Sequence, residues 1–198
     1  MQVLDETKRL KILDVAARLF ATEPFHVVTL DKIAAEAKIG KGTVYVYFKS
    51  KDDLFVSLIL EATESLLDEI KGESSTQSSP LNAWAEIKRI VDVLFEFWHR
   101  HPYLCSLMRD GVDLKDLRME EKRAEISNLC TQVIRRGVRS GEFKDPHPEL
   151  TGQYILALVR LSMLHSTPGV SDRVLRNHIL RILGNGLFAA HTPGEGKS

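Results

Sequence analysis

The stretch Thr29–Leu54, with the sequence TLDKIAAEAKIGKGTVYVYFKSKDDL, decides how this chain folds. Thr29 is a good helix N-cap, and the apolar residues after it recur at helical spacing as far as Ala37. A second short helix is expected from about Gly40 to Phe48. A helix, a sharp turn and a short second helix form a helix-turn-helix, whose second helix enters the major groove of DNA.

The segment Lys38–Lys51 has the chemistry of a surface that binds a polyanion. It contains four lysines and no acidic residue, interleaved with two tyrosines and a threonine. Cations and hydroxyl groups suit phosphate, and side chains on the first turn of a helix can read base edges. Residues 1–51 carry a net charge of +3, whereas residues 52–198 carry −3. Composition alone slightly favours the alternative of a solvated, lysine-rich turn, and ordinary charge scatter also accounts for the difference in net charge.

The rest of the chain also shows helical periodicity, and an all-α fold of about nine helices is predicted. The polar segment 72–80 is the clearest break in the chain. The expected helices cover residues 5–21, 29–37, 40–48, 50–70, 81–101, 103–109, 117–140, 150–166 and 172–189.

Composition argues against several classes of protein. No uncharged apolar run approaches the ~20 residues of a membrane span, and the N-terminus lacks the apolar region of a signal peptide, so a cytoplasmic protein is expected. The two cysteines, Cys105 and Cys130, match no zinc or redox spacing. His99 and His101 are two residues apart and would point to different sides of a helix, so no metal site is expected. No catalytic arrangement of side chains is visible, and no enzymatic activity or cofactor is predicted.

A specific motif carries a family resemblance. The run Gly42–Leu54, with the pattern Gly-Thr-x-Tyr-x-Tyr-Phe-x-Ser-Lys-x-x-Leu, resembles the N-terminal signature of the TetR (tetracycline-repressor-like) family. The preceding helix Ile12–Phe20 is similar to the first helix of that family, and the close match covers about residues 8–60. Arg136–Phe143 and His101–Leu104 look like segments common in the family's ligand domains.

Two residues depart from the family pattern. The family usually has Gly at the turn where this chain has Lys38, and a lysine there is strained if the turn needs a positive φ. The family often has Ser at the N-cap of the recognition helix where this chain has Gly40. Glycine is a weaker cap and offers no side-chain contact to phosphate.

The resemblance implies both a domain order and a function. Residues 1–50 would form a helix-turn-helix DNA-binding domain, residues 51–191 a helical ligand-binding and dimerisation domain, and residues 192–198 a disordered tail. The protein would be a ligand-responsive transcription regulator, a repressor that a small, mostly apolar effector releases from DNA. Because a two-fold dimer presents two recognition helices, its operator would be a palindrome in double-stranded DNA.

The resemblance also assigns roles on the DNA-binding surface. Thr29 would cap its helix and approach a phosphate, and Lys51 would pair with phosphate. Lys41, Thr43 and Val44 would face base edges or the adjoining backbone, while the tyrosines would contact sugar-phosphate or thymine methyl groups. The complete expected set is Thr29, Lys41, Gly42, Thr43, Val44, Tyr45, Tyr47, Lys49 and Lys51.

An aromatic-rich patch around residues 95–108 is either plain core or part of a pocket, since pockets are also lined mainly by apolar and aromatic groups. The resemblance implies a ligand cavity between the fourth and eighth helices. The residues expected to line it are Trp98, Tyr103, Met108 and Tyr154, together with Ala62 and Leu66 of the fourth helix.

The helix at 150–166 carries a single formal charge, Arg160, and is apolar on every side. A helix of that kind is buried on every side, so one face is expected to meet a second subunit. With the helix at 172–189 it would form the four-helix interface of a homodimer, as the resemblance implies. The alternative is the central helix of a monomer.

Two other classes of function remain open on the sequence. An all-helical enzyme or carrier of an apolar small molecule would lack the lysine- and tyrosine-rich short helix. A helical protein-interaction module would show an exposed apolar groove and no salt-dependent affinity for DNA.

Overall fold

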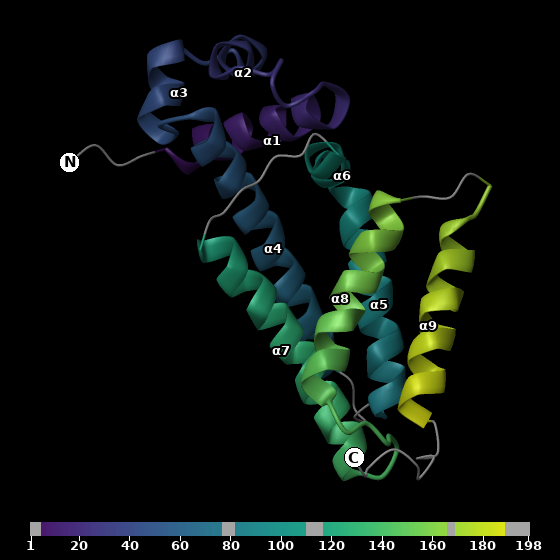
Figure 1. Ribbon diagram of the computed structural model, residues 1–198. Helices are drawn as coiled ribbons and strands as arrows, with labels where there is room; N and C mark the ends of the chain where they lie inside the picture. The colour runs from purple at the N-terminus through teal and green to yellow at the C-terminus, as the bar shows by residue number, and fades with distance from the viewer. Residues whose placement is uncertain (1–4, 77–81, 110–116, 166–168, 189–198) are drawn as a thin grey trace, which may run out of the picture. The chain divides into compact units, whose positions relative to one another are not determined.

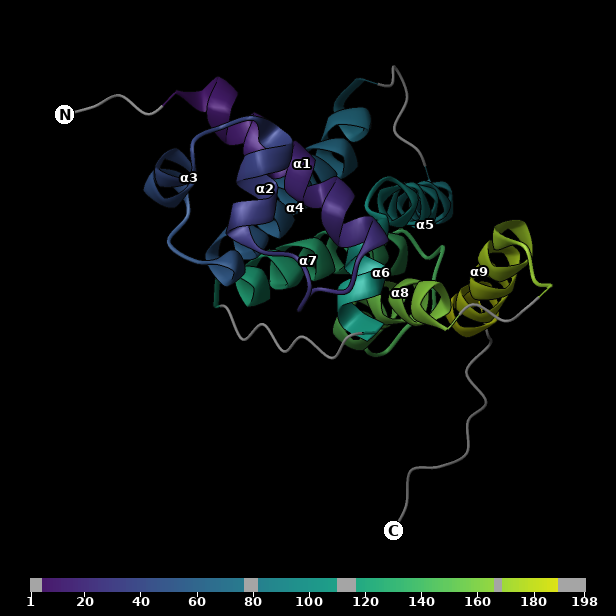
Figure 2. The same ribbon diagram turned by 90° about the horizontal axis from the view of Figure 1, so that it is seen from above.

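A computed structural model describes residues 5–76, 82–109, 117–165 and 169–188 (Figures 1 and 2). In these residues all the regular secondary structure is helical, as predicted, and none of the helices is long and apolar enough to cross a membrane. The expected tail at 192–198 lies outside the described residues. The helices are α1 Glu6–Thr22, α2 Leu30–Ala37, α3 Lys41–Tyr47, α4 Lys51–Thr76, α5 Ala83–Arg100, α6 Pro102–Arg109, α7 Leu117–Arg139, α8 Pro148–Leu164 and α9 Asp172–Phe188.

Internal contacts divide the chain into two compact units. Unit 1 comprises Met1–Leu67 and Phe97–Lys122, and it contains α1, α2, α3, α6 and the first part of α4. Unit 2 comprises Asp68–Glu96 and Arg123–Ser198, and it contains α8, α9 and the larger part of α5 and α7. Helix α4 therefore begins in one unit and ends in the other.

Side-chain caps fix the starts of the helices in unit 1. The Thr29 hydroxyl accepts a hydrogen bond from the Lys32 N–H at 3.2 Å, which starts α2 where the sequence predicts. The Ser50 hydroxyl accepts from the Asp53 N–H at 3.0 Å, while the Asp53 carboxylate accepts from the Lys49 N–H at 3.0 Å. This pair differs from a capping box in that the Asp53 carboxylate accepts from the residue before the N-cap, and it starts α4.

The turn between α2 and α3 is left-handed at Lys38, which has φ 53° and ψ 43°. The Lys38 N–H donates to the Ala35 carbonyl, and the Ile39 N–H donates to the Ala34 carbonyl. These bonds satisfy carbonyl groups that the end of α2 would otherwise leave unpaired. A lysine therefore occupies a position that favours glycine.

Three phenylalanines form the aromatic core of unit 1. The rings of Phe20 and Phe25 stack with centroids 5.3 Å apart, and Phe55 of α4 meets each of them edge-on at 5.6 and 5.5 Å. The Lys51 Nζ lies 4.2 Å from the Phe25 ring centroid and donates to the Phe25 carbonyl at 2.7 Å. Lys51 therefore ties the first turn of α4 to the loop between α1 and α2.

The fourth helix is longer than the sequence suggests. It was expected to end near Ile70, but α4 continues through Gly72 to Thr76. Glycine and serine only weaken a helix, whereas proline stops one, and the first proline beyond this point is Pro80. The remainder of the expected loop, residues 77–81, lies outside the described residues.

A close approach between α7 and α8 organises unit 2. Gly152 of α8 is buried, and a Cβ at that position would overlap the hydroxyl of Thr131 on α7. In the same unit, the Glu142 carboxylate accepts hydrogen bonds from the Ala83 and Trp84 N–H groups at 2.8 and 2.9 Å. A loop carboxylate thus satisfies the first donors of α5.

We expect Lys38→Gly to raise the free energy of unfolding by about 0.5–1 kcal/mol, because glycine adopts a positive φ without the steric penalty of a Cβ. Lys38→Ala is the matched control, since it removes the charged side chain but keeps the strain, and it should stay within ~0.5 kcal/mol of the wild type. Denaturant titration measures both. A glycine variant that is less stable than the alanine variant would contradict the strain.

We expect Lys51→Ala to lower the free energy of unfolding by about 1–2 kcal/mol, because it removes a charged hydrogen bond to a carbonyl and a cation–π contact. Lys49 is exposed and only two residues away, so Lys49→Ala should change stability by less than ~0.5 kcal/mol. Thermal and denaturant melts of the two variants decide the point. Equal stabilities would mean that the Phe25 contacts contribute nothing.

Candidate nucleic-acid interface and effector pocket

The outer face of α3 carries two large side chains that are exposed to solvent. Tyr45 and Val46 are 46% and 62% exposed, and both belong to the second half of α3. Val44 is fully buried, so its predicted contact with DNA is corrected here: its side chain packs in the core of unit 1. Val46 is not among the residues predicted to contact DNA, and its exposure follows from the helical period once Val44 is placed inside.

The lysines of this region differ in their surroundings. Lys49 is exposed. Lys41 is also exposed, and its Nζ lies 2.6 Å from the Asp31 carboxylate, which raises the pKa of the lysine above its ordinary value. Lys51 is half-buried and engaged with Phe25. Of these three lysines, Lys49 is the one that is exposed and whose ammonium group has no carboxylate partner in the described part of the chain.

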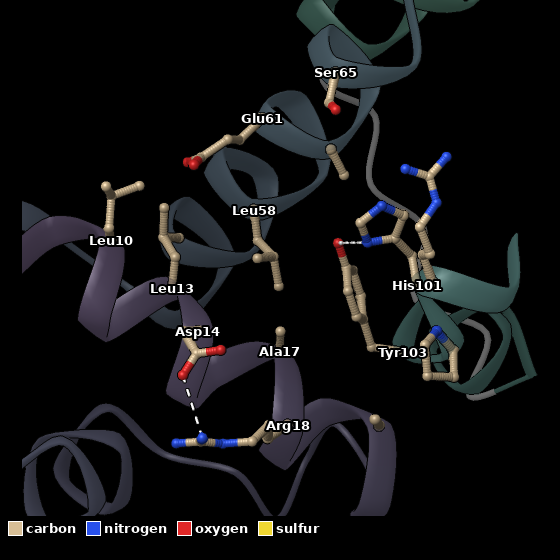
Figure 3. A pocket seen from close by; sticks show the side chains of 14 residues that line it. Leu10, Leu13, Asp14, Ala17, Arg18, Leu58, Glu61, Ser65, His101 and Tyr103 are labelled. Carbon is tan, nitrogen blue, oxygen red and sulfur yellow. Dashed lines mark hydrogen bonds and ion pairs between the residues drawn. The ribbon is translucent and has the colours of Figure 1, made fainter. Parts of the chain in front are cut away.

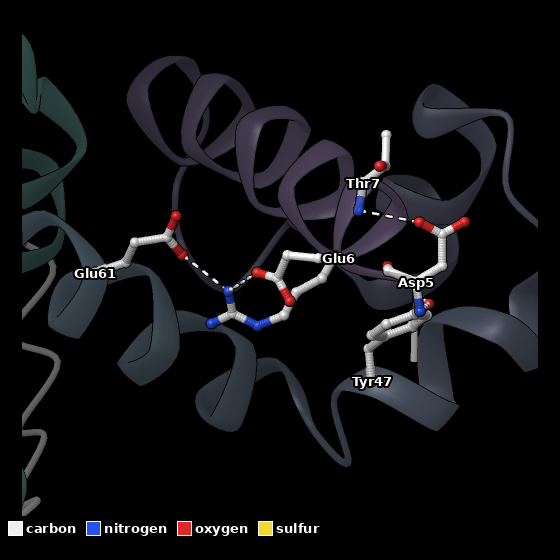
Figure 4. Close-up of polar contacts among 6 residues, drawn as sticks. Asp5, Glu6, Thr7, Tyr47 and Glu61 are labelled. Carbon is white, nitrogen blue, oxygen red and sulfur yellow. Dashed lines mark hydrogen bonds and ion pairs between the residues drawn. The ribbon is translucent and has the colours of Figure 1, made fainter. Parts of the chain in front are cut away.

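Tyr47 connects the end of α3 to the start of α1. Its hydroxyl donates to the Asp5 carbonyl at 3.0 Å and accepts from the Asp5 N–H at 2.9 Å (Figure 4). The Asp5 carboxylate in turn accepts from the Thr7 N–H and caps α1. The tyrosine therefore positions α3 on α1 by way of the backbone.

The other predicted DNA-contact residues lie at the helix starts. Thr29 is exposed at the N-cap of α2, although its hydroxyl already serves the cap. Gly42 is exposed, and no other group lies within 4 Å of the place where a Cβ would stand. Thr43 is half-buried. A bare backbone at Gly42 leaves room for the close approach of a phosphate.

Unit 1 also contains a pocket of about 640 Å³ (Figure 3). This volume falls within the roughly 300–1,000 Å³ of small-molecule sites. Its walls come from α1, from α4 and from the junction of α5 with α6. The lining residues are Leu10, Leu13, Asp14, Ala17, Arg18 and Ala21 of α1, Leu58, Glu61, Ala62 and Ser65 of α4, and Arg100, His101, Pro102 and Tyr103.

The polar groups of this pocket are paired. The His101 Nδ1 and the Tyr103 hydroxyl are 3.2 Å apart, and Figure 3 shows the two side chains facing α1 and α4. Desolvation by burial lowers the pKa of the His101 imidazole and raises that of the Tyr103 hydroxyl. Both groups are therefore uncharged near neutral pH.

Two of the predicted ligand-binding residues, Ala62 and Tyr103, line this pocket. Leu66 and Trp98 are buried in unit 1 but are not among its lining residues. Tyr154 lies on α8 in unit 2 and is 56% exposed. The side chain of Met108 lies outside the described part of the chain.

In the described residues, the two cysteines and the potential metal ligands do not form a reactive or metal-binding site. Cys130 is fully buried, and burial raises the pKa of its thiol to about 12, which disfavours the reactive thiolate. Cys105 is half-buried on α6. Across the described residues, no group of three or more His, Cys, Asp or Glu side chains is placed to hold a metal ion.

Comparison with known proteins finds a family match in the N-terminal part of the chain. Residues 12–58 match the family model of the bacterial regulatory proteins of the tetR family. The chain is 28% identical to the HTH-type transcriptional regulator YhgD of Bacillus subtilis, over 74% of this chain and 78% of that protein. It is 27% identical to the HTH-type transcriptional repressor KstR2 of Rhodococcus jostii, over 93% of each chain.

The fold is shared with solved regulators as well. The crystal structure of FadR from Bacillus subtilis in complex with stearoyl-CoA superposes with a TM-score of 0.76, at 22% identity, and the match covers 90% of this chain and 98% of that one. The segment 12–58 is therefore a DNA-binding region of the tetR family of bacterial regulatory proteins, and the chain is a DNA-binding transcription regulator.

Proposed function

We propose that this regulator is a repressor that binds a palindromic operator as a homodimer, and that a small, mostly apolar effector releases it. The observation that carries the proposal is the outward face of α3, where a tyrosine and a valine are exposed beside lysines. In a helix-turn-helix, the second helix enters the major groove and presents such a face to the bases. Residues 1–50 would form the DNA-binding domain, and residues 51–191 would bind the effector and the second subunit.

Each exposed residue of this surface has a role that its chemistry suits. Tyr45 and Val46 would meet base edges, with the valine in apolar contact with a thymine methyl group. Lys49 would pair with a phosphate, and the Gly42 and Thr43 backbone would lie close to another. Lys41 would exchange the Asp31 carboxylate for phosphate, which suits a lysine whose charge is already stabilised.

Three of the predicted DNA contacts are poor positions for a test of DNA binding alone. Thr29, Tyr47 and Lys51 would reach the DNA backbone, but each also holds the structure together through its own hydrogen bond. A substitution at any of them changes both stability and DNA binding. Lys49 is exposed, so its substitution should change DNA binding without changing stability.

We expect Lys49→Ala to weaken DNA binding about equally on all sequences and to reduce the slope of log K against log salt by about one unit. The DNA is a duplex selected from a random library with the purified protein, and affinity is measured by fluorescence anisotropy at several salt concentrations. Lys88→Ala, an exposed lysine on α5, is the control and should leave the slope unchanged.

Three results would contradict this part of the proposal. The random library could yield no enriched duplex, the enriched duplex could lack a palindrome, or Lys49→Ala could keep the wild-type slope. Transcription in vitro from a promoter that contains the selected duplex then tests repression. The purified protein should lower the transcript level, and an increase would mean an activator.

The dimer proposal rests on apolar side chains that face outward from α8 and α9, which lie side by side (Figures 1 and 2). Exposed apolar side chains on neighbouring helices are typical of an interface between subunits. We assign the homodimer interface to the helices predicted at 150–166 and 172–189. The large apolar residues exposed there are Leu150, Tyr154, Leu161, Val174, Ile182 and Phe188.

We expect Ile182→Arg to give a folded monomer, because a buried, unpaired guanidinium opposes association by several kcal/mol. Ile182 is 45% exposed in the single chain, so the arginine has solvent in the monomer. Val27→Arg, at an exposed apolar residue outside α8 and α9, is the matched control and should remain a dimer. Val159 is unsuitable for this test because it is fully buried and an arginine there would unfold the chain.

Light scattering and sedimentation measure the mass of each variant. A wild-type monomer at micromolar concentration, or an Ile182→Arg dimer as tight as the wild type, would remove α8 and α9 from the interface.

An apolar effector is supported by a relative and by the chain itself. FadR of Bacillus subtilis was crystallised with stearoyl-CoA, a ligand with a long apolar chain. In this chain the residues of unit 1 proposed to bind the effector, Ala62, Leu66, Trp98 and Tyr103, are apolar or aromatic, whereas Tyr154 belongs to the exposed surface of α8 that is proposed for the dimer. Because α4 starts at the helix-turn-helix and continues into unit 2, a shift of its distal half would reach the DNA-binding surface. Couplings of this kind change affinity by roughly 5–150-fold.

A further inference from the structure

We propose that the pocket bounded by α1, α4 and α6 binds an uncharged, mostly apolar small molecule through its aliphatic walls and the His101 imidazole, and that its occupation controls how the helix-turn-helix is held. This inference deepens the proposed function and rests on it for the link to DNA. It places a ligand inside unit 1, directly against α1.

The walls of the pocket favour an apolar molecule. Leucine and alanine side chains from α1 face leucine and alanine side chains from α4, and the Tyr103 ring closes the side towards α6 (Figure 3). Leu10 is 47% exposed and stands at the mouth. A molecule that entered would take these aliphatic groups out of water, at a gain of ~25 cal/mol for each Å² of apolar surface buried.

The charges around the pocket cancel and therefore select against an ion. Asp14 lies 3.3 Å from Arg18, and Glu61 lies 3.1 Å from Arg9 of α1. Among the lining residues themselves, Asp14 and Glu61 are matched in number by Arg18 and Arg100, so the lining carries no net formal charge. A carboxylate ligand would have to compete with Asp14 for Arg18, and a cationic ligand would have to compete with arginines for Asp14 and Glu61.

One group is placed to recognise a polar atom on the ligand. The Tyr103 hydroxyl can donate to the His101 Nδ1, which leaves the imidazole proton on Nε2. Nε2 makes no hydrogen bond to any residue in the described part of the chain. A neutral acceptor such as a ketone, ester or ether oxygen would satisfy this donor without introducing charge.

A ligand bound in the pocket acts on the DNA-binding surface through its contacts with α1. Six of the lining residues belong to α1, and the same helix packs on α2. The Tyr47 hydroxyl attaches the end of α3 to Asp5, just before α1 begins (Figure 4). The Arg9–Glu61 ion pair closes α1 on α4 beside the pocket. A ligand that fills the space between α1, α4 and α6 therefore fixes the position of α2 and α3 on α4.

The test uses a matched pair of fluorescent probes on the full-length protein. Prodan is a neutral naphthalene ketone, and 1-anilinonaphthalene-8-sulfonate is an anionic naphthalene. We expect Prodan to bind saturably with a blue-shifted emission, and the sulfonate not to displace it. Ala17→Trp fills the pocket and should weaken Prodan binding at least ~10-fold, whereas Ala124→Trp, on the exposed face of α7, should not.

His101→Phe tests the polar contact. It keeps an aromatic ring but removes Nε2, so it should weaken Prodan ~5-fold and abolish the emission component of a hydrogen-bonded ketone. A merely structural effect would leave that spectral component in place. If Ala17→Trp does not fold in thermal melts, Ala21→Trp fills the same pocket from the next turn of α1.

Several outcomes would overturn the inference. Prodan could fail to bind saturably, the tryptophan variant could bind it as tightly as the wild type, or the sulfonate could displace it with equal affinity. Saturating Prodan should also change affinity for the selected duplex by at least ~5-fold in the wild type and not in Ala17→Trp. A protein that binds the duplex but not Prodan refutes this inference alone. A protein that binds Prodan but no duplex refutes the proposed function.

Discussion

The stacked rings of Phe20, Phe25 and Phe55, with the Lys51 ammonium on Phe25, hold the helix-turn-helix on the start of α4. The rings come from α1, from the loop after it and from α4, so one cluster joins three segments. The cluster therefore fixes α1 and the loop after it against the first turns of α4. The positions of α3 and of the pocket walls depend on this packing.

Helix α1 explains why one small unit can hold both a DNA-binding surface and a pocket. Its buried face, with Ile12, Val15, Ala16 and Phe20, forms the core of the unit. Its other apolar residues, Leu10, Leu13 and Ala17, line the pocket. A helix that packs on both sides transmits a displacement on one side to the other, because close-packed side chains cannot absorb it.

The sequence alone established the class of fold and the kind of surface. The N-caps at Thr29 and Ser50 and the helical spacing of apolar residues are local features, and local features are encoded within a few residues of each other. The family signature at Gly42–Leu54 identified a helix-turn-helix for the same reason. The end of α4 was predicted wrongly because the composition of residues 71–76 is weak evidence both for and against a helix.

The tertiary structure decided which residues of these helices are available to bind. On sequence, Val44 and Val46 are equivalent, but the core of unit 1 takes Val44 and leaves Val46 exposed. Lys49 and Lys51 belong to one basic run, yet only Lys51 finds a ring and a carbonyl from a loop 26 residues away. The pocket unites residues of α1 with Tyr103, which lie far apart in the chain. Helix periodicity gives each residue a face, but which face meets a partner depends on long-range packing, and no short stretch of sequence contains that information.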